Sequence, residues 1–380
     1  MKTLFFISGF CCVYSYFIYP ILLKLLPARR KIESVQLVSN LSDLPSLSLI
    51  ITVHNEALRI KEKIENSLLI SYPNNLLEVI IASDGSTDET ELIVKSYADL
   101  GIKLVIADDR KGKEYAQLCA IRQATGDILV FSDVATHIQE KGLELLAMRF
   151  KDHEIGAISS EDRFISQDGS VVGEGAYVKY EMWLRGLEST RAGLVGLSGS
   201  FFAARSKVCK EWDISVPSDF NTALNCAKLG LVAISCSDVL GVYQDVKDSG
   251  LEYRRKIRTV VRGINAVVRH PEVLNPFKMK LFALQVWSHK IMRWAMPWFM
   301  LSFLVSSVLL SGEHWFYRVF ILLQLGFYSL VFIGQLFPVF RERLYVKIPY
   351  FFVQVNIAIA HATLQYLFGK RITVWEPSKR

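Results

Sequence analysis

Asp127-Ile-Leu-Val-Phe-Ser-Asp133-Val-Ala-Thr136 is an apolar run that ends on a carboxylate. Two earlier runs follow the same plan: Leu49-Ile-Ile-Thr-Val53 is followed by Asn55-Glu56, and Val79-Ile-Ile-Ala82 is followed by Asp84. Ligands of parallel α/β sheets bind beyond the carboxyl ends of the strands. We therefore expect these three acidic segments to converge on one crevice.

Short β-rich runs alternate with helical stretches from Leu47 to about Ala157. This alternation is typical of a mostly parallel sheet with helices on both faces. Helices are predicted at 113–125, ended by Gly126, and after the capping-type sequence at 87–90. Strands are predicted at 47–53, 77–82, 103–107, 128–132 and 155–160.

Four stretches have no Asp, Glu, Lys or Arg, namely 4–23, 294–312, 319–340 and 348–369. Each is close to the roughly 20 residues that cross a bilayer as a helix. A multi-pass membrane protein is the expectation. The first stretch exceeds a signal peptide's apolar region of roughly 7 to 15 residues, so a retained anchor is favoured. The last contains His361 and three amides, so either a partner-packed span or an interfacial segment fits it.

The net charge of +7 allows two interpretations, a surface for nucleic acid or basic residues beside membrane lipids. No basic stripe with interleaved aromatic residues and no nucleic-acid motif is present, so no nucleic-acid partner is expected. The six cysteines form no CxxC pair, which agrees with a reducing compartment. Arg29-Arg30-Lys31 follows the predicted anchor, residues 1–27, and favours a cytoplasmic location for the α/β domain.

Three short motifs occur in order after the predicted strands: His54-Asn55-Glu56, Asp84-Gly-Ser-Thr-Asp88 and Lys111-Gly-Lys113. In this order the chain resembles the membrane-anchored family 2 glycosyltransferases of the GT-A fold, including cellulose- and hyaluronan-synthase-like and exopolysaccharide enzymes. The resemblance covers roughly residues 45 to 265. It implies an α/β GT-A domain, with a mostly parallel sheet and helices on both faces, that binds a nucleotide-diphospho-sugar.

The predicted organisation follows from this resemblance and the apolar stretches. The segments are an anchor at 1–27, a GT-A catalytic domain at 45–250, an interfacial amphipathic segment at 251–293, membrane helices at 294–369 and a tail at 370–380. The expected location is the cell membrane, with the catalytic domain in the cytoplasm.

The resemblance assigns the donor site residue by residue. Glu56, Asp84 and Asp88 are expected to hold the nucleoside, although an acid at the position of Asp88 also suits a helix cap. Lys113 is expected to neutralise the diphosphate, although a lysine in a first helical turn is often a solvated surface residue. Asp133 matches the first acid of the DxD motif, which orients the ribose and a divalent cation, Mg²⁺ or Mn²⁺.

Position 135, which holds the second acid in that motif, is alanine here. A direct two-carboxylate metal site is therefore not expected. The ion is expected to bind through Asp133, the diphosphate and water.

Acceptor-side residues come from the second half of the domain. Ser198-Gly-Ser-Phe-Phe-Ala-Ala-Arg205 resembles the family strand lining the acceptor pocket, which implicates Ser198 and Gly199; an ordinary core strand is compatible with the same pattern. Asp219 aligns with the family's catalytic base, although Ser218 replaces a frequent acid and an Asp before a helix is commonly an N-cap.

Arg255 and Arg258 lie in a segment that resembles the family's (Q/R)xxRW motif, with Thr259 in place of Trp. Because they are three residues apart, they share a helix face and could both reach donor phosphate. A basic amphipathic helix on lipid headgroups is the other interpretation.

The resemblance implies an inverting transferase, through the family's single-displacement mechanism with Asp219 as base. It is expected to move a sugar from a nucleotide-diphospho-sugar, expected to be a UDP-sugar, to a glycan or glycolipid hydroxyl at the membrane. Two other functions fit the sequence. One is a polyprenyl-phosphate sugar synthase, which needs no hydroxyl base, and the other is a catalytically degraded scaffold subunit with polysaccharide-assembly partners.

Overall fold

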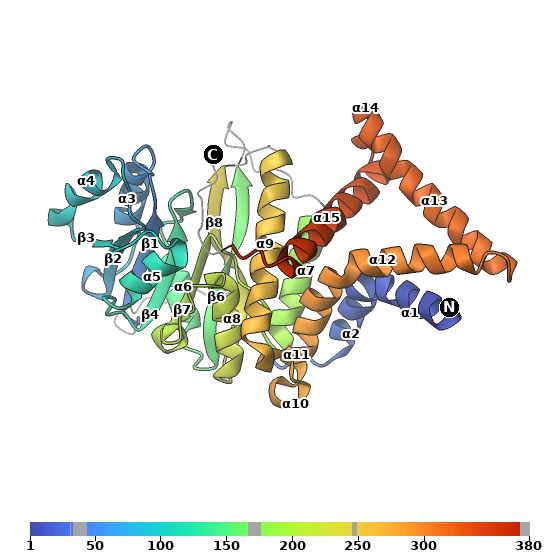
Figure 1. Cartoon of the computed structure of the whole chain (residues 1–380). Helices are drawn as coiled ribbons and strands as arrows, with labels where there is room; N and C mark the ends of the chain where they lie inside the picture. The colour runs from blue at the N-terminus through green and yellow to red at the C-terminus, as the bar shows by residue number, and fades with distance from the viewer. Residues whose placement is uncertain (31, 33–43, 166–175, 245–248, 373–380) are drawn as a thin grey trace. The chain divides into compact units, whose positions relative to one another are not determined.

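The computed structural model describes residues 1–30, 32, 44–165, 176–244 and 249–372 (Figure 1). Residues 373–380 of the predicted tail lie outside this set. The chain divides into two compact units. One comprises 26–247, 265–285 and 372–380 and holds the sheet; the other comprises 1–25, 248–264 and 286–371 and holds long helices.

The first unit is built on a mixed sheet with the strand order β3-β2-β1-β4-β7-β6-β8-β5 (Figure 1). The first four strands in this order are parallel, β7 runs antiparallel to β4 and β6, and β8 runs parallel to β6. The strands are β1 Leu47–Val53, β2 Leu77–Ser83, β3 Ile102–Ile106, β4 Ile128–Asp133, β5 His137–Ile138, β6 Ile155–Ile165, β7 Phe201–Arg205 and β8 Val232–Gln244.

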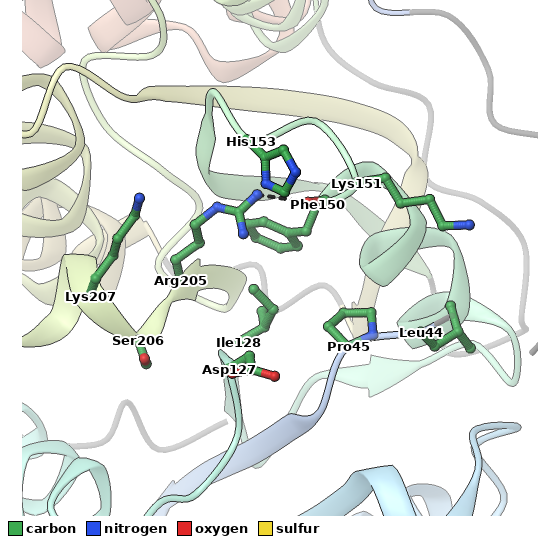
Figure 2. A pocket seen from close by; sticks show the side chains of 10 residues that line it. All are labelled: Leu44, Pro45, Asp127, Ile128, Phe150, Lys151, His153, Arg205, Ser206 and Lys207. Carbon is green, nitrogen blue, oxygen red and sulfur yellow. Dashed lines mark hydrogen bonds between the residues drawn. The ribbon is translucent and has the colours of Figure 1, made fainter. Parts of the chain in front are cut away.

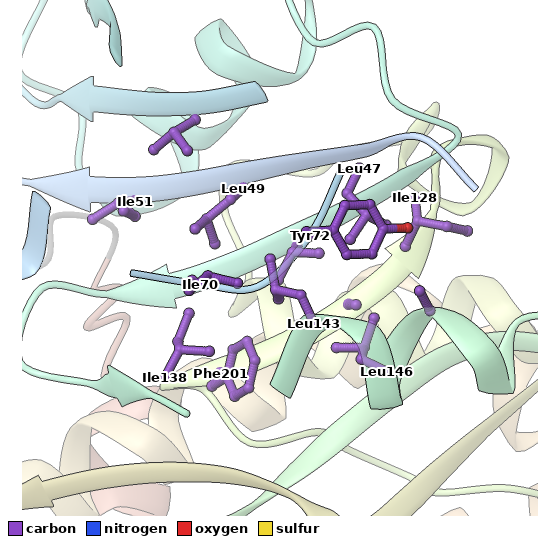
Figure 3. Packing of buried hydrophobic residues seen from close by; sticks show 14 of the residues in the cluster. Leu47, Leu49, Ile51, Ile70, Tyr72, Ile128, Ile138, Leu143, Leu146 and Phe201 are labelled. Atoms are coloured by element: carbon purple, nitrogen blue, oxygen red, sulfur yellow. The ribbon is translucent and has the colours of Figure 1, made fainter. Parts of the chain in front are cut away.

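Helices cover both faces of this sheet because its central strands are apolar on both faces. On β1, Leu49 and Ile51 belong to the core on one face, where Figure 3 shows them with Leu143 and Leu146 of α6. Residues of α3 also belong to this core, and Ile50 belongs to the opposite core with residues of α5 and α8. The unit's helices are α3 Ile60–Leu68, α4 Thr90–Lys95, α5 Lys113–Ile121, α6 Gly142–Arg149, α7 Ala176–Arg191, α8 Ser218–Lys228, α10 Pro276–Met279 and α11 Leu281–Val286.

The predicted fold class is therefore confirmed, with local differences in element length. The predicted helix at 113–125 ends at Ile121, and the predicted strand at 198–205 begins only at Phe201. Residues 198–200 form the approach to β7 instead, where Ser198 Oγ lies 2.9 Å from Ser200 Oγ. β5 has only two residues, too short for a period-2 pattern to predict it.

The second unit contains helices that are apolar over most of their length. Its packing centres on Phe5, whose ring lies 4.9 Å from the rings of both Phe303 and Tyr317. The helices are α1 Lys2–Val13, a π-helical turn Tyr14–Ile18, α2 Tyr19–Leu25, a second π-helical turn Trp287–Ile291, α12 Met292–Leu309, α13 Trp315–Leu336, α14 Pro338–Arg341 and α15 Leu344–Leu367.

Within the described residues, three helices are long and apolar enough to cross a membrane: Lys2–Leu25, Leu281–Leu309 and Trp315–Leu336. The second begins inside the segment predicted to be interfacial. The α15 helix, which covers most of the fourth apolar stretch, is not among the three. The helix α9, Ser249–Arg269, buries Ile257 and Val261 and exposes Arg254 and Arg255, so it is amphipathic.

Candidate active site

The ends of β1 and β2 are tied together by side chains that follow β1. Val53 and Ser83 are partners in the parallel register, so the residues after them meet. Asn55 adopts φ +53° and its Oδ1 accepts a hydrogen bond from the Thr87 N–H at 2.7 Å. His54 Nδ1 lies 2.8 Å from the Asp84 carbonyl oxygen. The two predicted nucleoside motifs therefore form one connected structure.

Asp84 is fully buried, with 0% of its surface exposed. Its Oδ1 accepts hydrogen bonds from the N–H groups of Lys111 and Gly112, at 3.1 and 3.0 Å. Its Oδ2 is buried without a hydrogen-bond partner among the described residues. A buried carboxylate oxygen in that state retains acceptor capacity for a ligand N–H or hydroxyl.

Glu56 and Asp88 lie beside this structure. Glu56 is 7% exposed and its Oε2 lies 3.2 Å from Arg59 Nε. Asp88 accepts hydrogen bonds from the N–H groups of Thr90, at 3.0 Å, and Ala57, at 3.1 Å. Burial opposes ionisation of Asp88, but these hydrogen bonds outweigh it and lower the pKa of the carboxyl. Asp88 thus satisfies the first N–H of α4 and one N–H of the segment after β1, although the N-cap position of α4 is Glu89.

Lys113 is the first residue of α5 and is only 9% exposed. Its Nζ lies 2.5 Å from Asp133 Oδ1 and donates to the Gly199 carbonyl at 2.9 Å. The alternative of a solvated surface lysine does not hold. Gly112, with φ +100°, allows the chain to turn into α5 at this point.

Asp219 lies in the first turn of α8 and faces the same place. Its Oδ2 is 3.4 Å from the position that a Cβ atom on Gly199 would occupy. The N-cap of α8 is Pro217, so the N-cap interpretation of Asp219 is wrong. Among the described residues none donates a hydrogen bond to the Asp219 carboxylate. The structure thus brings Lys113, Asp133, Gly199 and Asp219 together at the carboxyl end of β4.

A divalent ion would find a limited set of protein ligands here. The described residues contain no group of three or more His, Cys, Asp or Glu side chains placed to hold a metal. Asp133 offers a hard oxygen ligand of the kind that Mg²⁺ and Mn²⁺ prefer, and Ala135 offers none. These residues fit an ion whose remaining ligands come from a diphosphate and water.

One residue of the site was missed by the sequence analysis. Lys63 on α3 is 2% exposed, and its Nζ donates to Ser132 Oγ at 2.8 Å and to the Thr136 carbonyl oxygen. Burial lowers the pKa of Lys63 to about 7, against the opposing attraction of Asp133. The signal was available, because Lys63 lies between Ile60 and Ile64 on the apolar stripe of the helix.

Arg255 and Arg258 belong to the other compact unit, on α9. Arg255 is exposed, and its carbonyl accepts a hydrogen bond from Thr259 Oγ1 at 2.9 Å. Their assignment to the donor phosphate stays a prediction.

A cavity of about 780 Å³ lies at the opposite end of β4 (Figure 2). Asp127 and Ile128 line it, whereas Asp133 ends the same strand at the candidate site. Arg205 also lines it and donates to the carbonyl oxygens of Ile155 and Phe150, both at 2.7 Å. Because it lies at the amino end of β4, this cavity is separate from the crevice predicted for the donor.

Comparisons with known proteins identify the family of the sheet domain. Residues 48–211 match the model of glycosyl transferase family 2. The chain is 28% identical over 167 residues to the poly-β-1,6-N-acetyl-D-glucosamine synthase of Staphylococcus aureus (strain COL), covering 43% of this chain and 40% of that protein. It is also 28% identical over 133 residues to the probable glycosyltransferase YdaM of Bacillus subtilis (strain 168), covering 33% and 32%. The chain thus matches well under half the length of these relatives.

A solved structure shares the fold over nearly the whole chain. The mannosyltransferase PcManGT from Pyrobaculum calidifontis, in complex with GDP-Man and Mn²⁺, superimposes with a TM-score of 0.73 and 20% identity, covering 97% of this chain and 99% of that one. The fold is therefore GT-A, joined to apolar helices. The chain therefore carries a glycosyl transferase family 2 domain at residues 48–211.

Proposed function

We propose that the chain is an inverting, membrane-bound transferase that moves a sugar from a UDP-sugar to a hydroxyl of a polysaccharide or glycolipid. The observation that carries this proposal is the grouping of Lys113, Asp133, Gly199 and Asp219 at one strand end. A cation and a carboxylate suit the leaving diphosphate and its metal ion. The second carboxylate, which has no partner among the described residues, suits a base.

The nucleoside lies against the ends of β1 and β2 in this proposal. Asp84 uses one oxygen to hold the loop at Lys111 and Gly112, and its buried Oδ2 accepts from the base or ribose. Glu56 lines the same place. Asp88 contributes mainly by fixing the loop, since its oxygens already accept backbone hydrogen bonds.

Lys113 binds the diphosphate by exchanging partners. Its ammonium contacts Asp133 and the Gly199 carbonyl. A diphosphate placed beside it competes for the ammonium, and Asp133 is the residue that would hold a divalent ion, Mg²⁺ or Mn²⁺. When bound, that ion would supply positive charge to the leaving group through Asp133, and Lys113 supplies the rest.

Transfer is a single displacement. Asp219 accepts the proton of the acceptor hydroxyl, whose oxygen forms a bond to the anomeric carbon on the face opposite the diphosphate. The bond from that carbon to the diphosphate oxygen breaks, and the nucleoside diphosphate leaves with both electrons. Gly199 has no side chain, so an acceptor sugar can approach the backbone beneath Asp219.

We also propose that the catalytic unit faces the cytoplasm and that membrane lipids surround the apolar helices. The candidate spans support membrane attachment. Arg29 and Lys31 follow the first span and favour this orientation. Arg30 contributes less to it, because its guanidinium pairs with the carboxylate of Glu154 within the catalytic unit.

The test is a turnover assay of the purified full chain in lipid nanodiscs with labelled UDP-sugars, GDP-mannose and Mn²⁺. We expect one UDP-sugar to be hydrolysed or transferred well above the others. Turnover of GDP-mannose alone would overturn the UDP assignment. Nucleotide binding without turnover of any donor, in the presence of a membrane extract as acceptor source, would favour the scaffold interpretation. Transfer to a polyprenyl phosphate that survives Asp219→Asn would favour the polyprenyl-phosphate sugar synthase.

A further inference from the structure

The turn that carries Asp133 is braced on one side by the approach to β7. The Asp133 N–H donates to the Ser200 carbonyl at 2.9 Å, and the Thr136 N–H closes the turn on the Asp133 carbonyl at 3.1 Å. Thr136 Oγ1 also donates to the Ser200 carbonyl, at 3.3 Å. These contacts fix the backbone on the side of β7 alone.

Two side chains of α3 hold the turn from another direction. Lys63 Nζ donates to Ser132 Oγ, one residue before Asp133, and to the Thr136 carbonyl at the end of the turn. Its ammonium therefore connects both ends of the segment that presents the carboxylate.

Asn66 contacts His137 and Ile138, the two residues that follow the turn, and pairs with Ile138 as a neighbouring strand would. Its Oδ1 accepts from the Ile138 N–H and its Nδ2 donates to the Ile138 carbonyl, both at 2.9 Å. Nδ2 also lies 3.2 Å from His137 Nε2. Because Lys63 and Asn66 are three residues apart, they lie on the same face of α3.

Burying a lysine at this position has a free-energy cost. Desolvation of the ammonium opposes burial, whereas an aliphatic side chain would pack beside Ile60 and Ile64 without that cost. The observed hydrogen bonds all go to the segment around Asp133 rather than to a neighbouring carboxylate. This direction of the contacts indicates a role in placing that segment.

We propose that Lys63 and Asn66 are positioning residues that hold the Asp133 turn in the geometry needed for its divalent ion. The ion itself rests on the proposed function. Because Ala135 offers no second carboxylate, the placement of the single acidic ligand decides how well the ion binds with the diphosphate. Groups that orient a metal ligand typically change metal affinity or activity by about 10- to 100-fold when removed.

The variants are Lys63→Met, which keeps the side-chain length, Lys63→Gln, which keeps a hydrogen-bond donor, and Asn66→Ala. Lys61→Met is the matched control, since Lys61 is an exposed residue of the same helix whose Nζ lies 3.9 Å from Glu65. Calorimetry on the full chain measures UDP affinity in EDTA and across a Mn²⁺ series. Correct folding is checked by the thermal transition.

We expect Lys63→Met and Asn66→Ala to raise the Mn²⁺ concentration for half-maximal enhancement of UDP binding by about 10- to 100-fold. UDP affinity in EDTA should stay within about twofold, because the nucleoside side is unchanged. Lys63→Gln should recover part of the loss, and Lys61→Met should match the wild type. If Lys63→Met does not fold, Lys63→Gln and Asn66→Ala decide the outcome.

Hydrogen exchange of the peptide covering 131–138 gives a second readout that needs no ligand. Faster exchange there in Lys63→Met and Asn66→Ala, but not in Lys61→Met, is expected if α3 holds the turn. Unchanged exchange together with an unchanged Mn²⁺ requirement in the folded variants overturns the positioning role. If the wild type binds neither UDP nor Mn²⁺, the proposed function fails instead. Hydrogen exchange alone then tests whether Lys63 and Asn66 hold the Asp133 turn.

Discussion

The two halves of the candidate site use their carboxylates differently. At the ends of β1 and β2, Asp84 and Asp88 accept hydrogen bonds from backbone N–H groups, most of them in neighbouring loops. At the end of β4, Asp133 pairs with a lysine side chain, and the Asp219 carboxylate accepts no hydrogen bond from the described residues. Backbone contacts of the first kind persist when a ligand binds, whereas side-chain pairs of the second kind can be exchanged.

The ends of β1 and β2 therefore form a preformed surface, and the end of β4 forms a reactive one. Loops fixed by backbone hydrogen bonds preserve the shape that recognises a nucleoside and lower the cost of ordering on binding. Groups that must give up a proton or a partner during reaction cannot be bound so firmly. Substitutions at β4 and α8 should therefore affect turnover or ion binding, and substitutions at β1 and β2 should affect nucleotide affinity or loop stability.

The largest expected effect is on turnover. Asp219→Asn keeps the shape of the side chain but removes the proton acceptor, so transfer should fall at least about 100-fold, the usual scale for a general base. UDP affinity should not change. Steady-state transfer and calorimetry on the folded variant measure both. Glu211→Gln, at an exposed position in the segment between β7 and α8, is the control. Near wild-type transfer would exclude Asp219 as the base.

Lys113→Ala is expected to weaken UDP binding by about 10- to 150-fold, as loss of a charge-assisted hydrogen bond costs roughly 1.5 to 3 kcal/mol. Truncation also leaves the Asp133 carboxylate without its cation. Mn²⁺ should therefore offset part of the loss of UDP affinity by neutralising that carboxylate. Lys111→Ala is the control, because that exposed lysine pairs with Asp109 at 3.0 Å. Equal UDP affinity in the two variants would remove Lys113 from the diphosphate site.

Asp84→Asn tests whether the nucleoside side is more than a scaffold. An asparagine retains one oxygen for the N–H groups of Lys111 and Gly112 and replaces the buried Oδ2 with a donor. If Oδ2 accepts from the nucleoside, UDP affinity should fall about tenfold while the thermal transition moves little. Normal UDP affinity in this variant would show that Asp84 only holds the loop at Lys111 and Gly112.

Much of this arrangement could be predicted from the sequence because its signals are local. The apolar runs that form β1, β2 and β4 each end in a polar motif, and parallel pairing then places the three ends together. The strand bounds at Leu47–Val53 followed directly from the apolar pattern. Such signals need only the residues within one element and its following turn.

What the sequence left open depends on contacts between distant segments. Lys113 meets the Gly199 carbonyl across 86 positions, and no periodicity predicts that distance. The same holds for Lys63, whose acceptors lie about 70 positions further along the chain. Asp219 was correctly placed near a helix start, but only the structure distinguishes the cap, Pro217, from the residue inside the first turn.

Restoring the second acid should sharpen the contrast at β4. Ala135→Asp adds a carboxylate two residues after Asp133, so Mn²⁺ should bind at least about threefold more tightly in the absence of UDP. With UDP present the gain should shrink, because the diphosphate already supplies oxygen ligands. Metal titration followed by Mn²⁺ paramagnetic resonance measures both states. Ala135→Asn, which adds a neutral side chain of the same size, is the control. Full activity of the wild type in excess EDTA would contradict the metal assignment.

The smallest functional effect is expected at Asp88. Its oxygens hold the N–H groups of Thr90 and Ala57, so Asp88→Ala should cost about 1 kcal/mol of stability, as for a lost helix cap. UDP affinity should stay within about threefold. The pKa of Asp88 is lowered in the folded state, so its contribution is present above the unfolded carboxyl pKa and is lost as the pH falls through the folded value.

The difference in stability between wild type and Asp88→Ala should therefore narrow on acidification. Solvent screening at this exposed group limits the change. Thermal unfolding of both proteins across that pH range, with UDP calorimetry at neutral pH, tests the assignment. A loss of UDP affinity as large as that of Asp84→Asn, without a stability change, would contradict the loop-holding role. Asp88 would then be assigned a direct contact with the nucleoside. The two halves of the site would then differ less than their backbone contacts indicate.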